Sequence, residues 1–98
     1  MTTKTEQFDA AIRTTTQQRG EAYGSPLADF SRAALIKFAV SACPHDIVRH
    51  ALEMIGVKMS RLCTTPDHMD SVVDIAGYAR TIAMILDEEA KTHEKTPE

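Results

Sequence analysis

The clearest hydrophobic pattern in the chain lies between residues 46 and 63, where apolar side chains recur every three or four positions. This spacing places them on one face of an α-helix, which has 3.6 residues per turn. The positions are Val48, Ala51, Leu52, Ile55, Met59 and Leu62. The segment is therefore predicted to be a helix that packs this face against a core.

Three further segments are predicted to be helices, with turn residues between them. Their approximate bounds are residues 5–19, 26–43 and 66–90. Ser25 is a favourable N-cap residue, and Pro26 fits the first helical position because its missing N–H costs nothing there. Pro44 separates the second helix from the third. The sequence thus predicts an all-α fold of four helices, in which a short turn makes the third and fourth an antiparallel pair.

The fourth helix is expected to begin with Thr65 or Asp67 as its cap and Pro66 in its first turn. Its apolar residues form two stripes, Met69, Val72, Val73, Ala76, Ala83 and Leu86 on one and Ile75, Ala79, Ile82 and Ile85 on the other. A chain of this size has little core with which to cover so wide a surface. We therefore expect a homo-oligomer, most simply a dimer, that buries the second stripe.

Length and composition indicate one small globular domain over residues 1–98. The chain is 43% hydrophobic and 26% charged, which is ordinary for such a domain. Residues 1–4 and 91–98 are expected to be frayed, since the polar run at the C-terminal end has nothing to bury.

Charge and hydropathy exclude several classes of partner. Lys and Arg total 11 against 14 Asp and Glu, and the excess of −3 falls in residues 87–98, so the rest is neutral. Duplex DNA binding needs a basic excess along one face, and a membrane span needs about 20 apolar residues. The two cysteines are too few for a stapled secreted fold. We expect a cytoplasmic protein that binds neither duplex nucleic acid nor membrane.

A stripe of polar residues on the fourth helix is the first candidate for chemistry. Asp70, Asp74, Gly77 and Thr81 follow one another at spacings of four, three and four, so they share one side of the helix. Two carboxylates one turn apart repel by about 0.2–0.5 kcal/mol on an exposed helix. Something should therefore compensate their charge.

Two kinds of positive charge are candidates to compensate the two carboxylates. Lys58 and Arg61 share a face of the preceding helix and can pair with the carboxylates, either as plain ion pairs or as groups oriented toward a ligand phosphate. A divalent cation such as Mg²⁺ is the other, because oxygen ligands one helical turn apart suit its coordination. Glu53 would then be a third carboxylate, unless it is solvated or paired with Arg49.

Residues 19–26 are a second candidate, because Gly24 allows close approach of the backbone to a ligand. Arg19 would add a guanidinium fork and Tyr23 an aromatic face, so that the loop could hold a phosphate and stack a base. A tight turn with Tyr23 anchored in the core explains the same residues. Tyr78 has the same two interpretations. The four histidines lack the spacing of a zinc site, and no Walker or G-x-S-x-G motif is present.

These residues form a series that resembles a known family. The series is Arg19-x-x-x-Tyr23-Gly24, Lys58-x-x-Arg61-Leu62 and Asp70-Ser71-x-x-Asp74-Ile75-Ala76-Gly77-Tyr78-Ala79. It resembles a family of small phage and prophage proteins of unassigned function, over about residues 19–80. That family is distantly similar to MazG-like all-α pyrophosphatases, which hold Mg²⁺ on carboxylates of facing helices in a dimer and cleave nucleoside triphosphates to monophosphates.

The resemblance implies a phage-encoded protein that binds a nucleotide in the cytoplasm of a bacterial host. Phosphates would meet Arg19, Lys58 and Arg61, while the remaining contacts would come from Tyr23, Gly24, Asp70, Asp74 and Tyr78. The chain has few acids for a metal centre, so binding without turnover is favoured, which could sequester a nucleotide signal of host immunity. One alternative is a Mg²⁺-dependent pyrophosphohydrolase with Glu53, Asp70 and Asp74 on the metal. Another is a helical module that binds a host protein.

Overall fold

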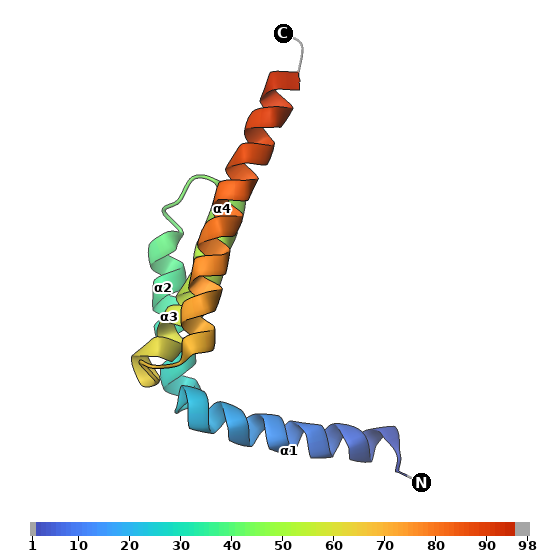
Figure 1. Ribbon diagram of the computed structural model, residues 1–98. Coiled ribbons are helices and arrows are strands. Elements are labelled where there is room, and N and C mark those ends of the chain that lie inside the picture. The colour runs from blue at the N-terminus through green and yellow to red at the C-terminus, as the bar shows by residue number, and fades with distance from the viewer. Residues whose placement is uncertain (1, 96–98) are drawn as a thin grey trace.

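The computed structural model describes the backbone of residues 2–95 and the side chains of residues 2–18 and 24–92. Within residues 2–95 the chain is all helical, with no strand (Figure 1). The four helices are α1 (Lys4–Tyr23), α2 (Pro26–Val40), α3 (Asp46–Thr64) and α4 (Met69–Lys95). The predicted all-α fold of four helices is confirmed.

Helices α2, α3 and α4 form a single layer with α3 in the middle. α3 contacts both neighbours, whereas α2 and α4 do not contact each other in the described part of the chain. α3 and α4 run antiparallel, as predicted, and α1 projects away from the layer, touching α2 and α3 only near its C-terminal end (Figure 1). The molecule is therefore elongated, with a radius of gyration of 18.3 Å, where about 13 Å is expected for a compact chain of this length.

The junction between α1 and α2 follows the predicted chemistry. Ser25 is the N-cap of α2, and its Oγ accepts a hydrogen bond from the Ala28 N–H at 3.4 Å. Gly24 has φ of +72°, and a Cβ at this position would lie 2.9 Å from Thr64 Cγ2. Only glycine fits both the backbone conformation and the close approach to α3.

Several helix ends differ from the prediction. α1 continues four residues beyond Arg19, and α2 ends at Val40 rather than Cys43, where the Ser41 N–H bonds back to the carbonyl of Lys37. α4 extends to Lys95, so the segment expected to fray from residue 91 is helical that far; residues 96–98 lie outside the described part.

The start of α4 is also different. Pro66 lies in the turn before the helix, because the His68 N–H bonds to the carbonyl of Thr65. The His68 carbonyl then accepts the N–H groups of Ser71 and Val72, so the helix begins at Met69. His68 Nδ1 also lies 2.7 Å from Ser71 Oγ. His68 thus occupies the position immediately before the first helical residue of α4.

Small side chains let the helices of the layer approach closely. Gly56 is buried where α3 meets α2, and a Cβ there would lie 2.6 Å from Ile36 Cγ2. Ser60 and Ser71 are fully buried at the two sides of α3. The contacts between helices thus depend on small and polar residues.

The described residues contain almost no apolar core. Ala51 is their only buried hydrophobic residue. Thirteen of their large apolar side chains are exposed: Phe8, Ile12, Leu27, Phe30, Leu35, Phe38, Ile47, Met59, Met69, Val72, Val73, Met84 and Leu86. On α4, Ile75, Ile82 and Ile85 are half-buried, so the stripe expected to meet another subunit is the better covered of the two. No helix in the described range is long and apolar enough to cross a membrane.

Candidate functional site

The basic pair and the acidic stripe meet at one ion pair between α3 and α4. Lys58 Nζ lies 3.0 Å from Asp74 Oδ2. The Lys58 side chain is only 14% exposed, whereas that of Asp74 is 46% exposed. The ammonium is therefore held at a fixed place in the layer, while the carboxylate opens to solvent.

Arg61 and Asp70 extend this pair by one helical turn on each helix. Arg61 is half-buried, and its Nε atom is buried. Asp70 is exposed, and no ion pair joins it to another side chain that the structure describes. The repulsion between Asp70 and Asp74 is thus balanced at Asp74, by Lys58.

Beyond Asp74 the stripe carries little that could contact a ligand. Gly77 is exposed, with nothing within 4 Å of the place a Cβ would occupy. Thr81 Oγ1 donates to the Gly77 carbonyl at 2.9 Å, within its own helix. Tyr78 is half-buried. The part of the stripe that lies near the basic residues of α3 is therefore limited to the two aspartates.

Glu53 lies on another side of α3. It is 4.0 Å from His50 Nδ1 and borders a groove of about 260 Å³ between α2 and α3. The groove is lined by Ala33, Ala34, Lys37, Glu53, Met54 and Val57. In the described part of the chain, no three His, Cys, Asp or Glu side chains gather closely enough to hold a metal ion. Within one chain, Glu53 therefore does not form such a cluster with Asp70 and Asp74.

The loop predicted to hold a phosphate is described only in part. Gly24 lies against Thr64 at the end of α3, one turn beyond Arg61. The backbones of Arg19 and Tyr23 belong to the end of α1, and their side chains lie outside the described ones. Their proposed contacts with a ligand stay predictions.

A buried polar cluster between α2 and α3 was not predicted. Ser60 Oγ donates to Asp29 Oδ1 at 2.6 Å, and Asp29 is only 7% exposed. Arg32 Nη1 donates to the Ser60 carbonyl at 2.9 Å. Polar residues at core-facing positions of two helices were the available signal, because buried polar groups need partners. The cluster fixes α2 against α3.

A second contact that was not predicted joins the start of α3 to the end of α4. His45 is the N-cap of α3, and in the neutral ring its Nδ1 accepts the Val48 N–H at 3.1 Å. Nε2–H donates to the Glu89 carboxylate at 2.8 Å. This hydrogen bond, together with the charge of Glu89, raises the pKa of His45 above 6.5. Histidine is not a usual capping residue, so capping preferences alone do not indicate this role.

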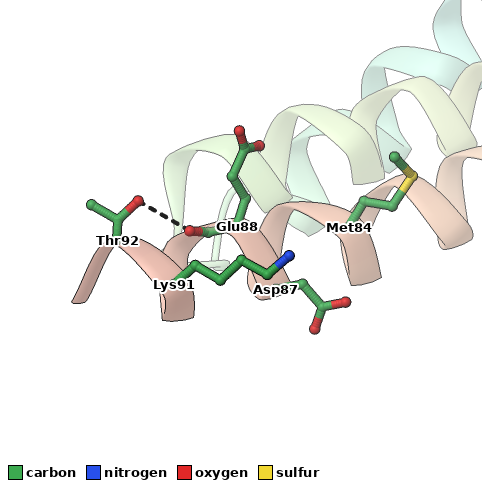
Figure 2. A pocket seen from close by; sticks show the side chains of 5 residues that line it. All are labelled: Met84, Asp87, Glu88, Lys91 and Thr92. Carbon is green, nitrogen blue, oxygen red and sulfur yellow. Dashed lines mark hydrogen bonds between the residues drawn. The ribbon is translucent and has the colours of Figure 1, made fainter. Parts of the chain in front are cut away.

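A larger hollow lies elsewhere on the chain. It measures about 580 Å³ and is lined by Met84, Asp87, Glu88, Lys91 and Thr92 (Figure 2). All five belong to α4, and Thr92 Oγ1 donates to the Glu88 carbonyl at 3.0 Å. Because a single helix lines it, this hollow is an open surface that cannot enclose a ligand. None of the predicted site residues borders it.

Comparison with known proteins places the chain in a family. Residues 6–86 match the family described as "Domain of unknown function (DUF6378)". The chain belongs to this family. It is also 33% identical over 84 residues to the Gene 55 protein of Mycobacterium phage L5, a match that covers 82% of this chain and 52% of the phage protein. The chain thus spans about half the length of that relative.

These matches confirm the resemblance to a phage protein family of unassigned function. No solved structure matches the chain. The similarity to MazG-like pyrophosphatases stays a prediction, and DUF6378 membership assigns no activity by itself.

Proposed function

We propose that this DUF6378 chain binds a phosphorylated, nucleotide-type small molecule where Lys58, Arg61, Asp70 and Asp74 lie. The observation that carries the proposal is the 3.0 Å ion pair between Lys58 and Asp74, with the lysine largely buried. Ordering a lysine side chain on ligand binding costs conformational entropy. Lys58 has already lost this entropy in the folded protein without ligand, because the ion pair holds it in place. A phosphate group would therefore meet an ammonium that is held in position.

The contact with Asp74 does not use all the hydrogen-bond donors of Lys58. An ammonium has three N–H donors, and one contact to Asp74 leaves others for a phosphate oxygen. Arg61, one turn along the same helix, adds a planar guanidinium that suits a second oxygen. Asp70 is exposed and can accept a hydrogen bond from a ribose hydroxyl. Tyr78, Tyr23, Arg19 and Gly24 are the further proposed contacts.

Binding without turnover has better support than metal-dependent hydrolysis. A two-metal hydrolytic site needs several carboxylates to neutralise its ions. In the described residues Glu53 faces the groove beside α2, whereas Asp74 pairs with Lys58 on the other side of α3. A protein of this kind, acting as a homo-oligomer in the cytoplasm of a phage-infected bacterium, would remove a nucleotide signal of host immunity from solution.

The direct test is to identify what the purified protein holds and binds. Mass spectrometry of heat-released small molecules would detect a retained nucleotide, and calorimetry would measure affinity for linear nucleotides, cyclic dinucleotides and inorganic phosphate. Lys58→Gln and Arg61→Gln should each weaken binding by about tenfold or more, because each removes a charge-assisted hydrogen bond of about 1.5–3 kcal/mol. Arg80→Gln, an exposed arginine on the outer side of α4, is the matched control.

Two results would refute the proposal. One is that no nucleotide or phosphate binds the wild-type protein. The other is that Arg80→Gln weakens binding as strongly as Arg61→Gln. Release of monophosphate from nucleoside triphosphates in the presence of Mg²⁺ would support the hydrolase alternative instead of binding without turnover.

A further inference from the structure

The layer of α2, α3 and α4 has two unlike faces. On α3, Lys58 points to α4 and Ser60 points to α2, in nearly opposite directions. At 100° per residue, the remaining side chains of α3 fall on two free sides between these directions. One side carries apolar residues, with the exposed Cys63 at its edge toward α2: Val48, Leu52, Ile55, Met59 and Leu62. The other side carries Asp46, His50, Glu53, Met54, Val57 and Arg61.

The neighbouring helices continue both sides. On α4, the same helical geometry, anchored on the contacts of Asp74 and Ser71 with the layer, places Asp70 and Thr81 with the polar side of α3. The apolar side of α4 consists of Val72, Ile75, Ala79, Ile82 and Leu86. On α2, Leu35 and Ala39 lie opposite Lys37, which borders the groove on the polar side. We call the apolar sides of the three helices, taken together, the apolar face, and the opposite side the polar face.

A single layer of helices cannot bury an apolar face, because a stable core needs a second layer packed against the first. The exposed residues on this face include Leu35, Met59, Val72 and Leu86. The chain has 7582 Å² of accessible surface, where a folded monomer of 10.8 kDa would have about 5,500 Å². The excess of roughly 2,000 Å² per chain includes the surface of the projecting α1, so about 4,000 Å² is the upper limit of what two copies could bury together; obligate homodimer interfaces bury about 2,000 Å² or more.

We propose that the apolar face is covered by a second copy of this chain, so that two layers pack face to face about a two-fold axis. A two-fold contact brings each patch against its own copy, so like charges on it would repel. The residues that form the apolar face are uncharged, although the chain as a whole carries −3. The interface is therefore broader than the fourth-helix stripe. It leaves Asp74, the more exposed member of the Lys58–Asp74 pair, accessible to solvent.

The test measures the mass of the full chain by light scattering and its melting temperature over a range of concentrations. We expect twice 10.8 kDa and a melting temperature that rises with concentration, as mass action requires for a dimer. Met59→Lys and Leu35→Lys put a charge on the apolar face at positions already exposed in one chain. Each should weaken dimerisation at least tenfold.

Phe38→Lys is the matched control, because Phe38 is exposed on the edge of α2 that points away from α3. It should keep the wild-type mass, as should Lys58→Gln, so loss of nucleotide binding and loss of the dimer are separate results. If Met59→Lys fails to fold, Leu35→Lys supplies the test from another helix. A wild-type chain that is monomeric, with a melting temperature independent of concentration, would overturn the proposal. So would an assembly that both face variants leave intact, or one that Phe38→Lys disrupts as strongly.

Discussion

Two glycines in the middle of helices should respond in opposite ways to replacement by alanine. Gly56 lies where α3 touches α2, and an added Cβ would be 2.6 Å from Ile36 Cγ2. Gly77 lies on α4, and an added Cβ would meet nothing within 4 Å. Both substitutions gain the same helix propensity, so the difference between them isolates the contact with Ile36.

The magnitudes follow from these distances. Alanine is favoured over glycine inside a helix by about 1 kcal/mol, so Gly77→Ala should raise the free energy of unfolding by about that amount. At Gly56 the clash adds an overpacking cost of about 1–3 kcal/mol. The obstructing methyl belongs to a β-branched side chain that is stiff at χ1, so Ile36 cannot simply rotate away. Gly56→Ala should therefore be less stable than Gly77→Ala by about 1–3 kcal/mol.

Urea denaturation followed by circular dichroism, at one fixed protein concentration, measures both free energies of unfolding. The double variant Ile36→Leu/Gly56→Ala moves the branch from Cβ to Cγ and should recover part of the loss, which a double-mutant cycle detects. If Gly56→Ala proves as stable as Gly77→Ala, α2 does not approach α3 at this point. The close packing of these two helices around Ile36 would then be wrong.

Two further predictions concern polar contacts. Glu89→Gln should lower the pKa of His45 toward 6.5, as measured by NMR titration. The control Glu88→Gln should leave this pKa unchanged. Equal pKa values in the wild-type protein and both variants would contradict the pairing of His45 with Glu89. Since the folded chain has the higher pKa, the pair stabilises the fold fully below the unfolded value of 6.5 and loses this effect as pH rises through the folded value. Ser60→Ala should cost about 1–3 kcal/mol in urea denaturation, because the buried Asp29 carboxylate loses its donor. No measurable loss would mean that water or a rearranged Arg32 replaces the hydroxyl.

Local sequence signals located the helices better than their ends. Ser25 and Pro26 carry strong N-terminal preferences, and α2 begins where they predict. Pro66 carries the same preference but lies in the turn before α4, because the chain closes a hydrogen-bonded turn from Thr65 to His68 first. His45 caps α3 although histidine ranks low as a capping residue. Its imidazole is useful there because Glu89, 44 residues away, takes the other ring nitrogen.

Periodicity could identify the apolar stripes of α4 but not which stripe meets α3. Both stripes have helical spacing, so the choice depends on the direction of the neighbouring helix. The observed direction is set by Asp74 against Lys58 and by the buried Ser71, which are polar residues that hydropathy alone places in solvent. The same reason explains why Asp29 and Ser60 were missed. Polar residues thus help to hold the helices together, while thirteen of the large apolar side chains that the structure describes are left exposed.

The candidate site was more predictable than the packing around it, because spacing along two antiparallel helices already brings Lys58 toward Asp74. What spacing cannot supply is an enclosed pocket. The groove on the polar face measures about 260 Å³, below the 300–1,000 Å³ typical of small-molecule sites, and it lies beside Glu53 rather than Asp74. A ligand at Lys58 would thus be held by its charged group, with much of the rest exposed. If so, affinity should depend strongly on salt and on phosphate number and weakly on the identity of the base. Strong discrimination between bases would instead indicate that the base contacts a side chain such as Tyr78 or Tyr23.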